Sequence, residues 1–147
     1  MGWTFYNSSG EQLIYDAGSA IEQATQAEAE AESNVNKYVP PDLIKNSPGV
    51  AKAYCTIAAD GTLQSNSYNI ASSSKNSAGN YDVEITTDMA NANYSANVTP
   101  EELNRYAVIQ NDAGSPLAGA LTLAVHKVSD QAAIDTPLHL TIHGLQV

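Results

Sequence analysis

Hydrophobic and polar positions alternate along the C-terminal two thirds of the chain. In GNYDVEITT (79–87), Tyr81, Val83 and Ile85 fall on one side of an extended chain and polar residues on the other, because successive strand side chains point to opposite faces. The same alternation runs through AGALTLAVHKV (118–128) and LHLTIHGLQV (138–147). The pattern predicts strands with one buried face, the last of which runs to the C-terminus.

Turn residues separate these segments and predict hairpins. SYNIASSS (67–74) is expected to pair with 79–87 across a long tip, KNSAGN (75–80), whose Asn, Ser and Gly residues tolerate positive φ. Asp60-Gly61 between KAYCTIA (52–58) and TLQSNSY (62–68) predicts a second hairpin. Four strands at about ten-residue spacing favour an antiparallel β-sandwich or meander over residues 50–147.

One helix is expected within this β domain. Thr99, Pro100 and Glu102 offer a cap, a proline at the first helical position and an acidic third position, a typical helix start. The pattern predicts a short helix at a corner of the sandwich.

The N-terminal region 1–36 is expected to serve attachment and oligomerisation. WTFY and EQLIY flank residues 7–10, which predicts a hairpin carrying Trp3 and Phe5. A two-stranded hairpin alone is marginally stable in water, so it must dock on something. Either Trp3 packs within an oligomer, or Trp3 and Phe5 attach the chain to a larger particle.

A helix is predicted to begin at Ser19, where Ser19 and Glu22 have the spacing of a capping box. Alanines then recur at spacings of four, three and four residues, and form with Ile21 the candidate oligomer interface: Ala20, Ile21, Ala24, Ala27 and Ala31. A helix of about 13 residues is marginal by itself, so identical helices are expected to support one another. The alternative is that the stripe packs on the sheet of its own chain.

A proline-rich connector, 37–49, links this helix to the β domain. Pro40, Pro41 and Pro48 restrict its backbone, and PDLIK allows one helical turn after Pro41.

Composition and charge limit the classes of partner that are expected. The net charge is −10 and the six Lys and Arg residues are scattered, so nucleic acid is not an expected partner. No apolar run approaches the ~20 residues of a membrane span, so membrane insertion is not expected. Cys55 is the single cysteine, which fits synthesis in a reducing cytoplasm. The many small side chains predict that the chain completes its core against copies of itself.

The candidate chemistry is sparse, and neither enzyme activity nor a cofactor is expected. His139 and His143 share a strand face about 13 Å apart, too far to chelate one metal, although a threefold axis could gather three copies of either histidine. Asp82 and Glu84 have the spacing of a glycosidase pair, but their face is predicted to be solvated. Cys55 is interpreted as a buried apolar thiol rather than a nucleophile.

The order of several segments resembles the C-terminal modules of tailed-bacteriophage tail fibres and related virion surface proteins. These segments are ATQAEAEAES (24–33), YVPPDL (38–43), PGVAKAYCTI (48–57) and SYNIASSSKNSAGNYDVEITTDMANANY (67–94). The resemblance covers residues 24–94. It implies a homotrimer at a phage surface, made in the host cytoplasm, that contacts other virion proteins and in some cases the host cell.

Two functions follow from these observations. In the first, the chain is a trimeric fibre or spike module that meets a host surface glycan or protein. In the second, it is a capsid decoration (cement or head-fibre) protein, an alternative favoured by the short chain without a long shaft. A carbohydrate-binding sandwich acting alone is a third class, which the alanine-rich helix disfavours. Tyr68, Tyr81 and Tyr94 would suit glycan binding, but we expect them in the core.

Overall fold

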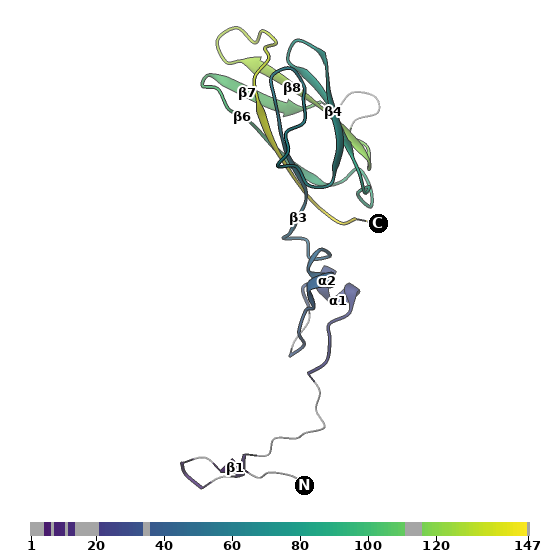
Figure 1. Cartoon of the computed structure of the whole chain (residues 1–147), viewed down its shortest axis with the longest axis vertical. Coiled ribbons are helices and arrows are strands. Elements are labelled where there is room, and N and C mark those ends of the chain that lie inside the picture. The colour runs from purple at the N-terminus through teal and green to yellow at the C-terminus, as the bar shows by residue number, and fades with distance from the viewer. Residues whose placement is uncertain are drawn as a thin grey trace.

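The computed structural model describes residues 5–6, 8–10, 12–13, 21–33, 36–110 and 116–146. Its main body consists of two antiparallel sheets that pack face to face (Figure 1). One sheet has the strand order β4-β5-β8-β7, and the other has the order β3-β9-β6. Consecutive strands β3 and β4 lie in different sheets, as do β5 and β6, so the arrangement is sandwich-like and not a meander.

The strand bounds agree with the strongest alternating segments of the sequence. The four-stranded sheet contains β4 (Ile70–Ser77), β5 (Asn80–Ile85), β7 (Arg105–Ile109) and β8 (Ala120–Lys127). The three-stranded sheet contains β3 (Ala51–Ile57), β6 (Ser95–Pro100) and β9 (Leu138–His143). The core between them takes the predicted inward positions of β5, β8 and β9: Tyr81, Val83, Ile85, Leu121, Leu123, Val125, Leu138, Leu140 and Ile142.

The two predicted hairpins differ in regularity. β4 and β5 pair as expected, but Ser77 is already opposite Asn80, so the tip is the two-residue turn Ala78-Gly79 and not a long loop. After Asp60-Gly61 the chain does return antiparallel to β3, through isolated bridges from Tyr54 to Tyr68 and from Ile57 to Leu63. Residues 62–68 therefore follow β3 without forming a regular strand.

The helix predicted at Thr99 is wrong. Thr99 and Pro100 instead end β6, paired with His139 and Leu138 of β9. β6 is an edge strand, and a proline is tolerated there because one side of the strand needs no hydrogen-bonding partner. Pairing along the whole of β9 thus outweighs a local capping pattern.

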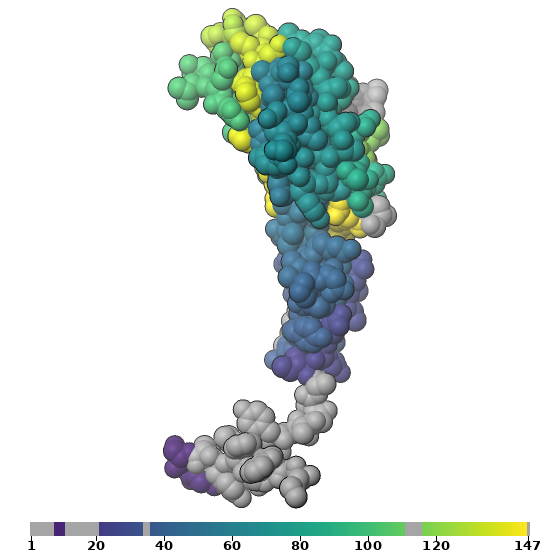
Figure 2. Space-filling model, viewed as in Figure 1, coloured from purple at the N-terminus to yellow at the C-terminus, as the bar shows by residue number. Residues whose placement is uncertain are grey.

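A small helical segment precedes the sandwich, and we call residues 21–33 and 36–50 the neck. It contains α1 (Gln26–Glu30) and α2 (Pro41–Ile44), the latter as predicted after Pro41, and it narrows the molecule beyond one end of the sandwich (Figure 2). The segment before α1 pairs with the segment between α1 and α2. The backbone N–H of Ala24 donates to the carbonyl of Tyr38, and that of Tyr38 donates to the carbonyl of Glu22. Neither described helix is long enough to cross a membrane.

The N-terminal hairpin is present in the backbone. β1 (Phe5–Tyr6) pairs with β2 (Gln12–Leu13), with Phe5 opposite Leu13. Trp3, Ser19 and Ala20, on which predictions were made, lie outside the described residues.

Candidate functional site

The alanine-rich segment does not form the single long helix expected from its sequence. Ile21 and Glu22 are not helical, and α1 begins only at Gln26 and has five residues. Thr25 is the N-cap: its hydroxyl accepts from the backbone N–H of Glu28, whose carboxylate accepts from the backbone N–H of Thr25. The capping box at Thr25 and Glu28 therefore sets the start of the helix, in place of the one predicted at Ser19.

The candidate interface residues consequently do not share one helix face. Ala24 lies before the helix and is buried, together with Ala29. Ala27 and Ala31 are exposed, and Ile21 is 71 % exposed. Tyr38 and Ile44 leave about half of their surfaces open on the same neck. Thus a single chain buries two alanines in its neck and leaves Ile21, Tyr38 and Ile44 exposed.

Lys37, which follows α1, makes ion pairs with α1 and with the segment before it. Lys37 donates to Glu28 over 2.9 Å and lies 3.4 Å from Glu22. The backbone N–H of Thr25, together with Lys37, lowers the pKa of Glu28 to about 2, because each bond stabilises the charged carboxylate.

A buried lysine joins the neck to the sandwich. Lys52 on β3 is only 1 % exposed, and its ammonium group donates to the backbone carbonyls of Lys45 and Ser47 at the end of α2. Its burial lowers the pKa of Lys52, because desolvation disfavours the charged form. Asn69 donates to the carbonyls of Lys52 and Thr87, and accepts from the N–H of Thr87.

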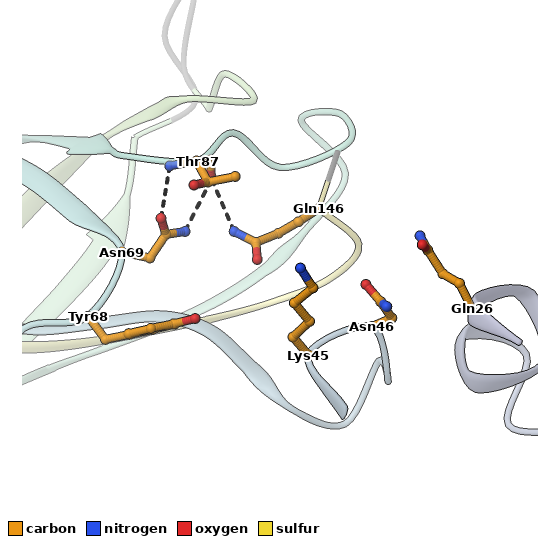
Figure 3. Close-up of a pocket in the computed structure, with 7 residues that line it drawn as sticks. All are labelled: Gln26, Lys45, Asn46, Tyr68, Asn69, Thr87 and Gln146. Atoms are coloured by element: carbon orange, nitrogen blue, oxygen red, sulfur yellow. Dashed lines mark hydrogen bonds between the residues drawn. The ribbon is translucent and has the colours of Figure 1, made fainter. Parts of the chain in front are cut away.

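These contacts surround a cavity of about 250 Å³ between the neck and the sandwich, which we call the junction pocket (Figure 3). Its lining is polar: Gln26, Lys45, Asn46, Tyr68, Asn69, Thr87 and Gln146. The first three residues come from the neck and the others from the sandwich. The segments 51–54 and 67–69 meet beside this pocket through the bridge between Tyr54 and Tyr68.

Tyr68 is the main departure from the expected core. It is 49 % exposed and stacks on Tyr54, with ring centroids 5.7 Å apart and the planes 25° from parallel. Tyr81 is fully buried as predicted, and Tyr94 packs against the core with its hydroxyl donating to the carbonyl of Ala120. The segment 62–68 follows the edge of the sheet irregularly, so the alternation that orients Tyr81 inward does not apply to Tyr68.

The cysteine and the paired carboxylates considered as reactive groups lie on strands of the sandwich. Cys55 is buried on β3, and its desolvation raises the pKa of the thiol to about 11. Asp82 accepts from Asn76 and Thr122, and Glu84 accepts from Ser72. Both carboxylates are therefore engaged with neighbouring side chains on the outer face of the sheet.

His139 contacts a hydroxyl and a carboxylate at once. Its Nδ1 lies 3.1 Å from Thr56 Oγ1, and its Nε2 lies 3.0 Å from a carboxylate oxygen of Glu101. The arrangement has the members of an acid–histidine–hydroxyl triad, but His139 and Glu101 are about half exposed on an open sheet face. Oxyanion stabilisation is strongest where water is excluded, and the side chains of His139 and Glu101 are in contact with water. Within the described ranges, no group of three or more His, Cys, Asp or Glu side chains is arranged to hold a metal.

Comparisons with protein-family models, with curated proteins and with solved structures found no match for this chain. The junction pocket and the apolar surface of the neck, both defined by geometry, are therefore the candidate sites. The pocket gave no local sequence signal, because its residues come from five separate segments that only the fold brings together.

Proposed function

We propose that this chain is a non-enzymatic structural protein of a tailed-bacteriophage virion, a homotrimeric tail fibre or spike module whose sandwich faces the host surface. The class of protein is supported by the segment order over residues 24–94 described above. The trimer is the state that this resemblance implies. Oligomerisation has an independent physical support in the neck.

The observation that carries the proposal is the apolar surface of the neck. Isolated helices shorter than about 12–15 residues are marginal in water, and α1 and α2 have five and four residues. Ile21, Tyr38 and Ile44 remain exposed on this segment. At ~25 cal/mol per Å² of apolar surface removed from water, covering such side chains with neighbouring copies stabilises the neck. Ile21, Ala27 and Ala31 are available for that contact, whereas Ala24 is already buried within its own chain.

A non-enzymatic role is supported by the state of the reactive side chains. Cys55 is buried with a raised pKa, and the His139 cluster lies on an open surface. The N-terminal hairpin, with Trp3 and Phe5, is proposed to contact other virion proteins.

A second candidate is a capsid decoration protein that reinforces the shell. The observation that favours it is the shortness of the neck, since the two described helices make no extended shaft. Both candidates need oligomers and differ in their position on the particle.

Immunogold electron microscopy of virions that carry this chain tests the proposal. Labelling at the tail tip supports a fibre or spike module, and labelling over the head supports decoration. Recombinant chain should also reduce adsorption of the phage to its host, with Ile21→Glu as the matched variant that fails to assemble. A chain absent from purified particles would contradict both candidates.

A further inference from the structure

We propose that the junction pocket binds one saccharide unit of a glycan, with Tyr68 as the ring on which the sugar stacks and Lys45 and Asn46 as hydrogen-bond donors. The inference deepens the proposed function, because it names a contact chemistry for a module that faces a host surface. The pocket is formed by a single chain, so it does not depend on the number of copies.

The aromatic side of the pocket is exposed and supported from behind. Figure 3 shows Tyr68 along one side, with Asn69, Thr87 and Gln146 opposite. Tyr54 stacks on Tyr68 and restricts its movement. Two half-exposed tyrosines side by side are an apolar surface that water covers poorly. The C–H face of a pyranose ring is flat and apolar enough to pack on such a surface, while its hydroxyl groups stay at the edge.

The polar side of the pocket offers unused donors. Asn46 Nδ2 is buried and has no hydrogen-bond partner among the residues that the structure describes. The Lys45 ammonium group likewise makes no bond within this part of the chain, and it points into the space between Tyr68 and Gln146 (Figure 3). Buried polar groups are nearly always hydrogen-bonded, so the unpaired amide of Asn46, beside the pocket, favours a turn of its side chain towards a ligand that supplies an acceptor.

Other amides that line the pocket are held in place by the protein. Asn69 makes three bonds to backbone atoms of Lys52 and Thr87, and Gln146 donates to the carbonyl of Thr87 over 3.1 Å. These bonds fix the wall opposite Tyr68 before any ligand arrives. A preformed wall lowers the entropy lost on binding.

Charge and size narrow the ligand to a sugar. The lining contains one lysine and no carboxylate, in a chain of net charge −10. A phosphate site normally gathers several cationic or backbone donors, which a single lysine does not supply. Hydroxyl, ring, acetamido or carboxylate oxygens of a saccharide would each accept from Lys45 and Asn46. A volume of about 250 Å³ suits one pyranose ring rather than a long oligosaccharide.

The test begins with a glycan array that spans neutral and carboxylated pyranosides, probed with the full chain. Saccharides that bind are then titrated by NMR against the amide-labelled protein. We expect shift changes at the side-chain amides of Asn46, Asn69 and Gln146. Strengthened binding at low salt would indicate a carboxylated sugar at Lys45, and salt-independent binding a neutral one.

Substitutions distinguish the stacking of the sugar on Tyr68 from the hydrogen bonds donated by Lys45. Tyr68→Ala should weaken binding by about tenfold, because the ring contact is lost, whereas Tyr68→Phe keeps the ring and most of the affinity. Leu103→Ala is the control, since Leu103 is an exposed apolar residue that belongs neither to the neck nor to the pocket lining. Lys45→Gln should weaken binding several-fold, and Lys127→Gln controls for the loss of one positive charge.

Three results would overturn the inference. The first is that no member of the array binds, and the second is that the pocket amides do not shift. The third is that Tyr68→Ala lowers the oligomer mass, which would assign the tyrosine pair to an interface between copies. A chain found on virions that binds no saccharide would keep the proposed function and remove this inference. A chain that binds a saccharide at the pocket but is absent from virions would keep this inference and remove the proposed function.

Discussion

Lys52 Nζ lies 2.7 Å from the backbone carbonyl oxygen of Ser47, and this bond ties the first strand of the sandwich to the end of α2. The same ammonium group also donates to the carbonyl of Lys45. Burying a charge is unfavourable unless its hydrogen bonds are replaced, and here two carbonyls replace them. The position of the neck, and with it of Lys45 and Asn46 in the junction pocket, thus depends on Lys52.

Lys52→Met should loosen the neck while leaving the sandwich folded. Methionine keeps a long apolar stem but loses the donors, so α2 is no longer held, whereas the relief of charge burial offsets part of the loss in global stability. Amide hydrogen exchange should accelerate at Asn46 and Ser47, whose N–H groups bond to Leu43 and Ile44. The denaturation midpoint should shift little. Unchanged exchange at Asn46 and Ser47 would show that Lys52 does not hold the neck.

Tyr81→Phe should lower the free energy of unfolding by about 1–2 kcal/mol. The Tyr81 hydroxyl lies 3.1 Å from the carbonyl of Ala59 and accepts from the backbone N–H of Thr136 over 3.3 Å, all at the edge of the core. Phenylalanine leaves that buried N–H without its acceptor. Tyr94→Phe is the control, since the Tyr94 hydroxyl donates to the carbonyl of Ala120 and accepts from no backbone N–H among the described residues, so this variant should lose less stability in the same urea titration.

Gly79→Ala should destabilise the β4–β5 hairpin strongly. Gly79 has φ +69, and a Cβ there would lie 2.5 Å from the carbonyl oxygen of Val125 and 2.8 Å from the N of Ile134. Backbone atoms cannot move aside as a side chain can, so we expect a loss on the order of 1–3 kcal/mol. Gly49→Ala meets nothing closer than 3.9 Å and should be nearly neutral or slightly stabilising. Equal melting temperatures for the two variants would contradict the close backbone contacts of Gly79 in this turn.

Acid should weaken the neck through Glu28. Its pKa is lowered from 4.5 to about 2 by the Thr25 backbone N–H and by Lys37, so the folded state binds fewer protons than the unfolded state in that range. The contribution is therefore complete above pH 4.5 and is lost as the pH falls towards 2. An NMR titration of the Glu28 side chain should give a midpoint near 2. Glu28→Gln should reduce the acid sensitivity of α1, with Glu32→Gln as the control for net charge; a midpoint near 4.5 would contradict the capping box.

The sequence predicted the elements that bury one regular face. β5, β8 and β9 were found because Tyr81, Leu123 and Leu140 belong to strict alternations, and period-two burial leaves little choice of structure. β6 and β7 were missed because their inward residues are small or mixed, for example Ala96 and Ala107, and the capping pattern at Thr99 suggested a helix instead.

The neck illustrates a different limit. Two capping-box spacings flank the start of the alanine-rich segment, Ser19 with Glu22 and Thr25 with Glu28, and the second begins α1. Local chemistry does not choose between them, because a short helix depends on what it packs against. The junction pocket could not be predicted from the sequence for the same reason: Lys45 and Tyr68 belong to separate segments, and the contacts of Lys52 with the end of α2 hold the neck beside the sandwich.

Sedimentation equilibrium of the full chain tests the central claim, that the exposed apolar surface of the neck is covered by copies of the same chain. The account predicts a mass three times the 15.5 kDa of one chain, falling when Ile21→Glu places a charge on that surface. A folded monomer in dilute solution, with α1 and α2 protected from hydrogen exchange, would contradict it.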